Sequence, residues 1–336
     1  MAKIHDVAYR AGVSPATVSR VYNQPKLVSP ATRKRVTTAA AELDYLPNAV
    51  ARGLATGRSG VVGLIVPDIT NPYFGYIARG CSDAFNQRQL TLALYNSEEQ
   101  SSREDYMRLL IHQRQADGLI ITSEAASIDK VSEHISKSQI PTVYIERQPD
   151  EPHIDAVYVD NQRAAQCAVE YLLTLGHKKI ATITGAMSTM TGKERLQGFL
   201  KGLTQAGIHL LDTYIYEGNF KLDGGAAAAE QIMASPDPPT AVFVASDLMA
   251  YGAIGAFTSN GWDVPGTISV VGCEDLPFSR YFSPKLTTMR IPIYEIGRHA
   301  AQLLIKRLAK PARKASIEVL GAELIIRQSA CRADSQ

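Results

Sequence analysis

Charged and hydroxyl side chains stand directly beyond several short apolar runs of this chain. These residues are Asp68, Glu146, Arg147, Ser246, Asp247, Glu274 and Asp275. With the aromatic pair Tyr73 and Phe74, such groups suit a polyhydroxylated ligand, because its hydroxyls can be hydrogen-bonded at the edges while an aromatic face stacks on a ring. A carboxylate at any single position could equally cap a helix or close a turn. As a set, the residues indicate a small-molecule binding site.

Motifs for catalysis or metal binding are missing from the sequence. The 7 histidines show no HExxH spacing, and the 4 cysteines form no CxxC pair. There is no GxSxG nucleophile elbow, and the segment GRSGVVG (57–63) precedes an apolar run, whereas a dinucleotide-binding loop follows one. We therefore expect a protein that is not an enzyme and that holds no cofactor or metal.

A second group of residues that could do chemistry lies near the N-terminus. Its members are Pro15, Ala16, Thr17, Ser19 and Arg20, which would share the outer face of a short helix. In a DNA major groove, Arg20 could donate two hydrogen bonds to a guanine edge and Ala16 could touch a thymine methyl group. Thr17 and Ser19, like the basic run 33–35, fit phosphate contacts better. This face therefore indicates base reading.

Three short helices would position that face. Apolar residues recur at helical spacing, and they are Ile4, Val7, Ala8 and Ala11 in the first helix, Val18 and Val21 in the second, and Val36, Ala40 and Leu43 in the third. Gly12 ends the first helix, and Ser14-Pro15 and Ser29-Pro30 are N-cap and first-turn pairs that open the other two. This order predicts a helix-turn-helix, although a purely structural three-helix bundle would show the same periodicity.

The charge distribution separates this head from the rest of the chain. Of the 336 residues, the first 60 carry a net charge of +6, while the others carry −4. A small basic module on a mildly acidic body is typical of nucleic-acid binding, since neutralisation of phosphates dominates such affinity; an ordinary solvated surface is the alternative.

The body alternates short apolar runs with longer helical stretches, which favours parallel sheets covered on both faces. The runs are VVGLIV (61–66), LTLALY (90–95), GLIIT (118–122), PTVYI (141–145), KIATIT (179–184), AVFVA (241–245) and ISVVG (268–272). They form two similar sets, before and after about residue 162. We therefore predict two doubly wound α/β lobes. Ligands of such sheets bind beyond the carboxyl ends of the strands, where the polar residues stand.

The head resembles the LacI/GalR family of bacterial transcriptional regulators almost position by position. The matching stretches are IHDVAYRAGVSPATVSRVYN (4–23), VSPATRKRV (28–36) and LDYLPNAVARGLA (43–55). The resemblance implies DNA contacts by the helix-turn-helix residues Ser14, Pro15, Ala16, Thr17, Ser19 and Arg20. It also implies a hinge helix over 48–55 in which Asn48 and Ala51 face DNA and Leu54 inserts into the minor groove. Eight residues including a glycine are too few for a stable isolated helix, so hinge folding should be coupled to DNA binding.

The resemblance extends over nearly the whole body. It rests on VPDITNPYF (66–74), LGHKKIATITG (175–185), ERLQGF (194–199), PTAVFVASDLMAYGA (239–253), ISVVGCEDLPFSRYFSPKLTTMRIPIYEIG (268–297) and ELIIRQS (323–329). By position it implies effector contacts at Tyr73, Phe74, Arg195, Asp247 and Asp275, and more loosely at Glu146, Thr191 and Phe220. Cys273 and Glu274 stand where relatives commonly have an aromatic residue and an aspartate, and Ile291 stands where glutamine is frequent, so the pocket would suit an unusual effector.

These observations define the expected organisation. The resemblance implies a periplasmic-binding-protein-like sensor behind the head, with domains at 1–47 (helix-turn-helix), 48–59 (hinge and linker) and 60–336 (effector binding). The N-lobe would hold 60–162 and 293–320, and the C-lobe 163–292 and 321–336. No leucine heptad follows ELIIRQSACRADSQ, so a homodimer on a palindromic operator is expected.

The expected function is that of a cytoplasmic repressor of transcription controlled by a sugar, or alternatively by a nucleoside. A transport receptor of the periplasmic kind is the main rival, because its two-lobed fold is similar. The N-terminal residues lack a secretory signal, and the sequence has no apolar run long enough to span a membrane, which argues against that rival.

Overall fold

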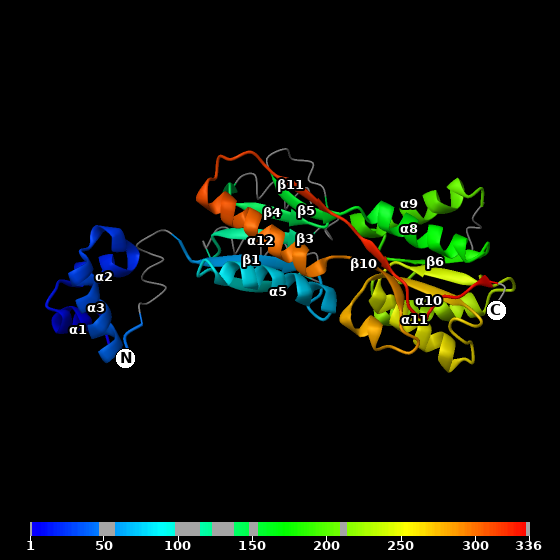
Figure 1. Ribbon diagram of the computed structural model, residues 1–336, viewed down its shortest axis with the longest axis horizontal. Helices are drawn as coiled ribbons and strands as arrows, with labels where there is room; N and C mark the ends of the chain where they lie inside the picture. The colour runs from blue at the N-terminus through cyan, green and yellow to red at the C-terminus, as the bar shows by residue number, and fades with distance from the viewer. Residues whose placement is uncertain are drawn as a thin grey trace.

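The computed structural model describes residues 2–46, 58–97, 115–122, 138–147, 154–208 and 214–333. These residues form a small helical head and two α/β lobes, and Figure 1 shows the two lobes end to end with the head beyond the first of them. The predicted fold class, a helix-turn-helix head on a two-lobed sensor of mainly parallel sheets, is confirmed.

The head consists of α1 (Ile4–Ala11), α2 (Pro15–Asn23), the 3-10 turn η1 (Pro25–Leu27) and α3 (Pro30–Glu42). Gly12 ends α1 with φ 63°, a left-handed conformation that glycine adopts without steric cost. The side chains of Ser14 and Ser29 accept hydrogen bonds from the backbone N–H groups of Thr17 and Thr32, as the sequence predicted. Val18 and Val21 of α2 are buried, so the opposite face of that helix is left to solvent.

The N-lobe is built on a six-stranded sheet in the order β11-β5-β4-β3-β1-β2. Its strands are β1 (Val61–Val66), β2 (Thr91–Asn96), β3 (Gly118–Thr122), β4 (Thr142–Ile145), β5 (Asp155–Val159) and β11 (Ile317–Leu320). Every neighbouring pair is parallel. Helices α5 (Pro72–Asn86) and α12 (Ile293–Ala309) pack on each other and on this sheet. The carboxyl ends of the central strands therefore meet at one edge.

The C-lobe repeats this plan with the sheet order β12-β10-β9-β8-β6-β7. Its strands are β6 (Ile180–Thr184), β7 (Ile215–Glu217), β8 (Ala241–Val244), β9 (Ser269–Glu274), β10 (Thr287–Arg290) and β12 (Glu323–Ile325). Helices α8 (Asn161–Thr174) and α9 (Met190–Gln205) pair on one face, and α10 (Leu222–Met233) and α11 (Asp247–Ser259) pair on the other (Figure 1). The edge strand β12 is antiparallel to β10, an exception to the parallel pairing that the sequence predicted.

The chain passes between the lobes three times in the described ranges. The first passage joins β5 to α8, the second joins β10 to α12 through 291–292, and the third joins β11 to β12 through 321–322 (Figure 1). Each passage is short, which is the arrangement that lets two rigid lobes change their mutual angle through a few backbone torsions.

Candidate functional site

The outer face of α2 presents the residues predicted to read bases. Ser14, Ala16 and Arg20 are exposed, and Pro15, Thr17 and Ser19 are half-buried at its edges. The hydroxyl of Ser14 caps the helix at Thr17, and that of Ser19 accepts a hydrogen bond from the Asn23 amide at 3.1 Å. The structure thus places all six residues on or beside the side of α2 that faces away from its buried valines, the side on which base contacts are predicted. Their contacts with DNA stay a prediction.

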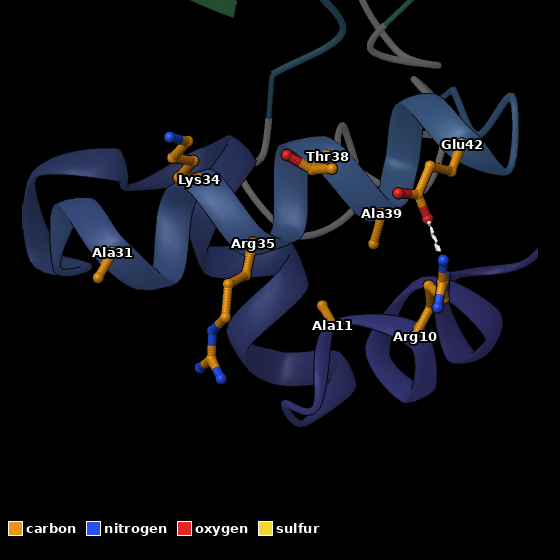
Figure 2. A pocket seen from close by; sticks show the side chains of 8 residues that line it. All are labelled: Arg10, Ala11, Ala31, Lys34, Arg35, Thr38, Ala39 and Glu42. Carbon is orange, nitrogen blue, oxygen red and sulfur yellow. Dashed lines mark hydrogen bonds and ion pairs between the residues drawn. The ribbon is translucent and has the colours of Figure 1, made fainter.

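The basic run 33–35 of α3 divides between two roles. Arg33 donates to the carbonyl oxygens of Pro25 and Val28, at 2.9 and 3.4 Å, so it holds the turn before α3. Lys34 and Arg35 line a hollow of about 500 Å³ between α1 and α3, which Figure 2 shows from close by. Arg33 is thus engaged within the head, and the phosphate contacts expected of the run stay a prediction.

The ion pair of this hollow joins Arg10 to Glu42 at 2.7 Å, and both side chains are substantially exposed (Figure 2). The predicted hinge residues Asn48, Ala51 and Leu54 lie outside the described residues.

The N-lobe contributes an aromatic pair and a carboxylate to the second candidate site. Tyr73 and Phe74 begin α5, where Asn71 caps the helix by accepting from the Tyr73 N–H, and their rings meet edge to face with centroids 5.3 Å apart. Glu146 follows β4 with φ 66° and is hydrogen-bonded to Tyr73. Burial raises the pKa of both the Tyr73 hydroxyl and the Glu146 carboxyl.

The C-lobe contributes an arginine that is only 2% exposed. Arg195 of α9 donates from Nε to Asn161 Oδ1 at 3.0 Å and from Nη1 to the Ala245 carbonyl oxygen. The same Nη1 lies 3.4 Å from Glu274 Oε1. The charge of Arg195 also acts on Tyr73 and Glu146, and therefore links the polar ends of the two lobes.

Glu274 is the carboxylate that β9 places in this cluster. Burial raises its pKa to about 8, although the charge of Arg195 opposes the shift. Burial likewise raises the pKa of the adjacent Cys273 thiol to about 12, so that side chain stays neutral. The Oε2 atom of Glu274 and the hydroxyl of Thr191, one helical turn before Arg195, are both buried without a hydrogen-bond partner in the described chain.

Asp247, also predicted as an effector contact, is completely buried and engaged inside the C-lobe. It accepts from the hydroxyls of Thr288 and Ser279 at 2.6 and 2.5 Å, and from the Leu276 N–H at 2.9 Å. Burial nevertheless raises its pKa to about 6. The carboxylate therefore fastens the loop after β9 to the start of α11, and its predicted contact with an effector stays a prediction.

Asp275 lies between two arginines near the passages between the lobes. Its carboxylate oxygens are 2.8 Å from Arg290 Nε and 2.6 Å from an Arg327 nitrogen. Arg290 ends β10, just before the second passage, and also pairs with Glu323, which opens β12 after the third. An effector contact by Asp275 stays a prediction as well.

The ring of Phe220, predicted as a looser match, lies directly over Gly185 at the end of β6. A Cβ atom at Gly185 would stand only 1.9 Å from that ring, so a larger residue there would force the ring to move. The half-buried ring is thereby placed at the carboxyl edge of the C-lobe sheet, where its predicted stacking on an effector would occur.

Sequence reasoning missed two members of the cluster. Glu274 was recognised as a strand-end residue, but the site was assigned to Asp275, since the resemblance favoured it. Asn161 was not singled out, although it is buried and orients Arg195. The available signal was its position two residues beyond the strand 155–159.

Two further searches concern only the described ranges. They contain no group of three or more histidine, cysteine, aspartate or glutamate side chains placed to hold a metal ion. They also contain no helix with the length and hydropathy needed to cross a bilayer.

Two family models match the chain. Residues 3–48 match the model described as bacterial regulatory proteins of the lacI family. Residues 59–327 match the model described as periplasmic binding proteins and sugar binding domain of the LacI family. The two matches coincide with the helical head and the two lobes.

Relatives and a solved structure match over nearly the full length. The chain is 34% identical to the transcriptional repressor PurR of Photobacterium profundum, over 98% of both chains. It is 36% identical to catabolite control protein A of Priestia megaterium, over 97% of this chain and 98% of that one. The lac repressor dimer bound to operator and the anti-inducer ONPF is similar with a TM-score of 0.87 and 29% identity, over 98% of this chain and 99% of that one. The protein accordingly belongs to the LacI family of bacterial regulatory proteins.

Proposed function

We propose that this protein is a transcriptional repressor whose affinity for a palindromic operator is set by a small molecule, a sugar or a nucleoside, bound between its lobes. One observation carries the proposal: a solvent-exposed recognition face on α2 is joined in one chain to a buried polar cluster shared by two hinged lobes. The first feature suits DNA and the second suits a small ligand. An enzyme would not require an exposed recognition helix together with such a cluster.

The DNA-binding mechanism assigns base reading to α2 and positioning to the rest of the head. Arg20 contacts a guanine and Ala16 a thymine methyl, while Lys34 and Arg35 neutralise phosphates. Leu54 of the hinge inserts into the minor groove beside Asn48 and Ala51. Its insertion unstacks a base step and bends the duplex, at a cost of about a few kcal/mol that the additional contacts offset.

The effector contacts are Tyr73, Phe74 and Glu146 from the N-lobe, and Thr191, Arg195, Phe220 and Glu274 from the C-lobe. Carboxylates, a guanidinium and aromatic rings together match a sugar or nucleoside. Asp247 and Asp275 are further effector contacts in this mechanism, because a carboxylate can accept additional hydrogen bonds beside those that already hold it. Both also hold the loop that carries Glu274.

Coupling between the sites follows from the passages between the lobes. A ligand that binds one lobe arrangement better shifts the population toward it, and so changes the spacing of two heads in a homodimer. A hundredfold change in operator affinity requires about 2.7 kcal/mol of coupling, and operator DNA must change effector affinity by the same factor. Because its target is DNA, we place the protein in the bacterial cytoplasm.

The test is a fluorescence-anisotropy titration of the full chain with symmetric duplexes at several salt concentrations. We expect tight binding that weakens steeply with salt, and a much weaker complex with a duplex carrying one half-site. A panel of sugars and nucleosides added to the preformed complex should contain a compound that changes the affinity at least about tenfold. Equal affinity for symmetric, half-site and random duplexes would contradict the proposal.

A further inference from the structure

The segment that enters the N-lobe from the head is tied to one aspartate. Asp117 stands directly before β3, and its Oδ1 atom accepts from the Ser59 N–H at 2.7 Å and from the Ser59 hydroxyl at 3.0 Å. Its Oδ2 atom accepts from the Gly60 N–H at 2.9 Å. Successive backbone N–H groups that converge on one negative group are an arrangement by which proteins hold anions. We call Ser59, Gly60 and Asp117 the linker clasp.

Further hydrogen bonds hold the same segment from both sides. The Gly60 carbonyl oxygen accepts from the Thr91 N–H at 2.9 Å, and the Val61 carbonyl oxygen accepts from the Asp117 N–H at 2.8 Å. The Ser59 hydroxyl also accepts from the Val61 N–H at 3.1 Å. Gly60 has φ 71°, a conformation that glycine adopts without steric cost. The direction of the chain is therefore fixed at residues 59–61.

The carboxylate of Asp117 acts on the linker and not on the pairing of the sheet. Strand β1 begins at Val61, and its pairing with β3 begins at Val62, opposite Gly118. Ser59 and Gly60 precede both positions, on the side from which the head is attached. The ladder between β1 and β3 therefore does not include the residues that the carboxylate holds.

The linker clasp and the proposed effector contacts of the N-lobe lie at opposite ends of the same strands. The clasp is at the amino ends of β1 and β3, whereas Tyr73 follows β1, and Glu146 follows β4, the neighbour of β3. Strand β1 has 6 residues, which span about 20 Å. Because these buried strands are hydrogen-bonded into one sheet, a rotation of the N-lobe carries the clasp with it.

Resting on the proposed function, we propose that Asp117 is a positioning residue for DNA binding, because its hold on Ser59 and Gly60 fixes the point at which the hinge and head leave the N-lobe. Ser59 follows the predicted hinge, 48–55, by four positions. In a homodimer, a head on a fixed exit meets the second half-site at a high effective concentration, and only at one separation of the half-sites. Release of the exit lengthens the tether, lowers this effective concentration and admits other separations.

The test measures how full-length protein responds to the separation of the half-sites. One duplex is the symmetric one that the parent binds most tightly, and the other carries one additional central base pair, which turns the half-sites by about 35° and moves them apart by about 3.4 Å. We expect the parent to bind the first duplex at least about tenfold more tightly, and Asp117→Ala to reduce this ratio to about threefold or less. The affinity for a half-site duplex should stay unchanged, because the head is not altered.

Two further variants separate positioning from stability. Ser59→Ala removes only the hydroxyl contacts, so its ratio should lie between those of the parent and Asp117→Ala. Asp83→Ala is the matched control, because Asp83 of α5 accepts from the side chains of Arg79 and Tyr294 within the same lobe. It should lower the thermal midpoint of the protein and keep the ratio of the parent. If Asp117→Ala does not fold, Ser59→Ala decides alone.

Two results would overturn the proposal while the repressor assignment stands. In the first, the clasp variants have a lower thermal midpoint but keep the ratio of the parent, which would show a purely structural role. In the second, the parent binds duplexes of both separations equally, which would show that the exit does not fix the distance between the heads. A parent that binds symmetric and random duplexes equally would instead contradict the proposed function, and this proposal with it.

Discussion

The recognition face of the head and the polar cluster between the lobes differ in how their polar groups are exposed. On α2, the side chain of Arg20 is exposed. Between the lobes, Arg195 and Glu274 are almost completely buried. Binding DNA therefore adds interactions to groups that the folded head does not use, while binding a small molecule completes groups whose burial already costs stability. Substitutions in the polar cluster should change the free energy of unfolding, and those on the recognition face should not.

The largest expected effect is on the pH dependence of stability. The Glu274 carboxyl, with its pKa raised to about 8 by burial, binds a proton more tightly in the folded than in the unfolded state. Its contribution to stability is therefore greatest in acid and is lost as the pH rises from the ordinary glutamate pKa toward 8. We expect the Glu274→Gln protein to gain on the order of a few kcal/mol over the parent at about pH 8, and far less at about pH 5.

The measurement is urea unfolding of both proteins across that range. Other groups also titrate there, including His177, whose pKa burial lowers, but they are common to the two proteins and cancel in the difference. A difference that stays constant from acid to alkaline pH would contradict the assigned environment of Glu274.

A smaller loss of stability is expected for Asp247→Asn. Asparagine retains one acceptor oxygen, and its amide group would point a donor at the Leu276 N–H or at a hydroxyl that now donates to the carboxylate. The free energy of unfolding should fall by about 1–3 kcal/mol. Asp223→Asn, at an exposed position of α10, is the control and should change it little. If Asp247→Asn were as stable as the parent, the hydrogen bonds to Asp247 would not be what holds the loop after β9.

The two regions also differ in how far the sequence predicted them. The head was predicted down to its caps, because Ser14, Ser29 and the periodicity of the buried valines act within a few residues. Helix α3 is shorter than expected, ending at Glu42 with Leu43 half-buried at its cap. The two-lobed fold was predicted from the alternation of short apolar runs with helical stretches, and each of these is also recognised from neighbouring residues.

For the polar cluster between the lobes, the sequence predicted the region but not which residues face one another. Strand ends identified Glu146, Asp247 and the pair Glu274-Asp275, since parallel strands end at one edge. Which member of that pair faces the cluster depends on the backbone at both positions and on Arg290 and Arg327, which come from outside the strand. The role of Asn161 depends likewise on its contact with Arg195, 34 positions away. Such contacts between distant segments leave no periodic signal in a single sequence.

The smallest effect on stability is expected at the recognition face, and it completes the comparison. Arg20→Ala removes an exposed side chain, so the free energy of unfolding should stay within about 0.5 kcal/mol of the parent. Operator binding should nevertheless weaken by about 1–3 kcal/mol, with the loss confined to duplexes carrying the preferred base at one position, because a bidentate base contact is specific. Arg33→Ala is the matched control, and it should lower the stability of the head, because Arg33 holds the carbonyl groups of Pro25 and Val28. Unfolding and anisotropy measurements on both variants distinguish the two roles. Loss of stability in Arg20→Ala would show that this arginine supports the fold. An equal loss of affinity for every duplex would show that it contacts phosphates and does not read a base.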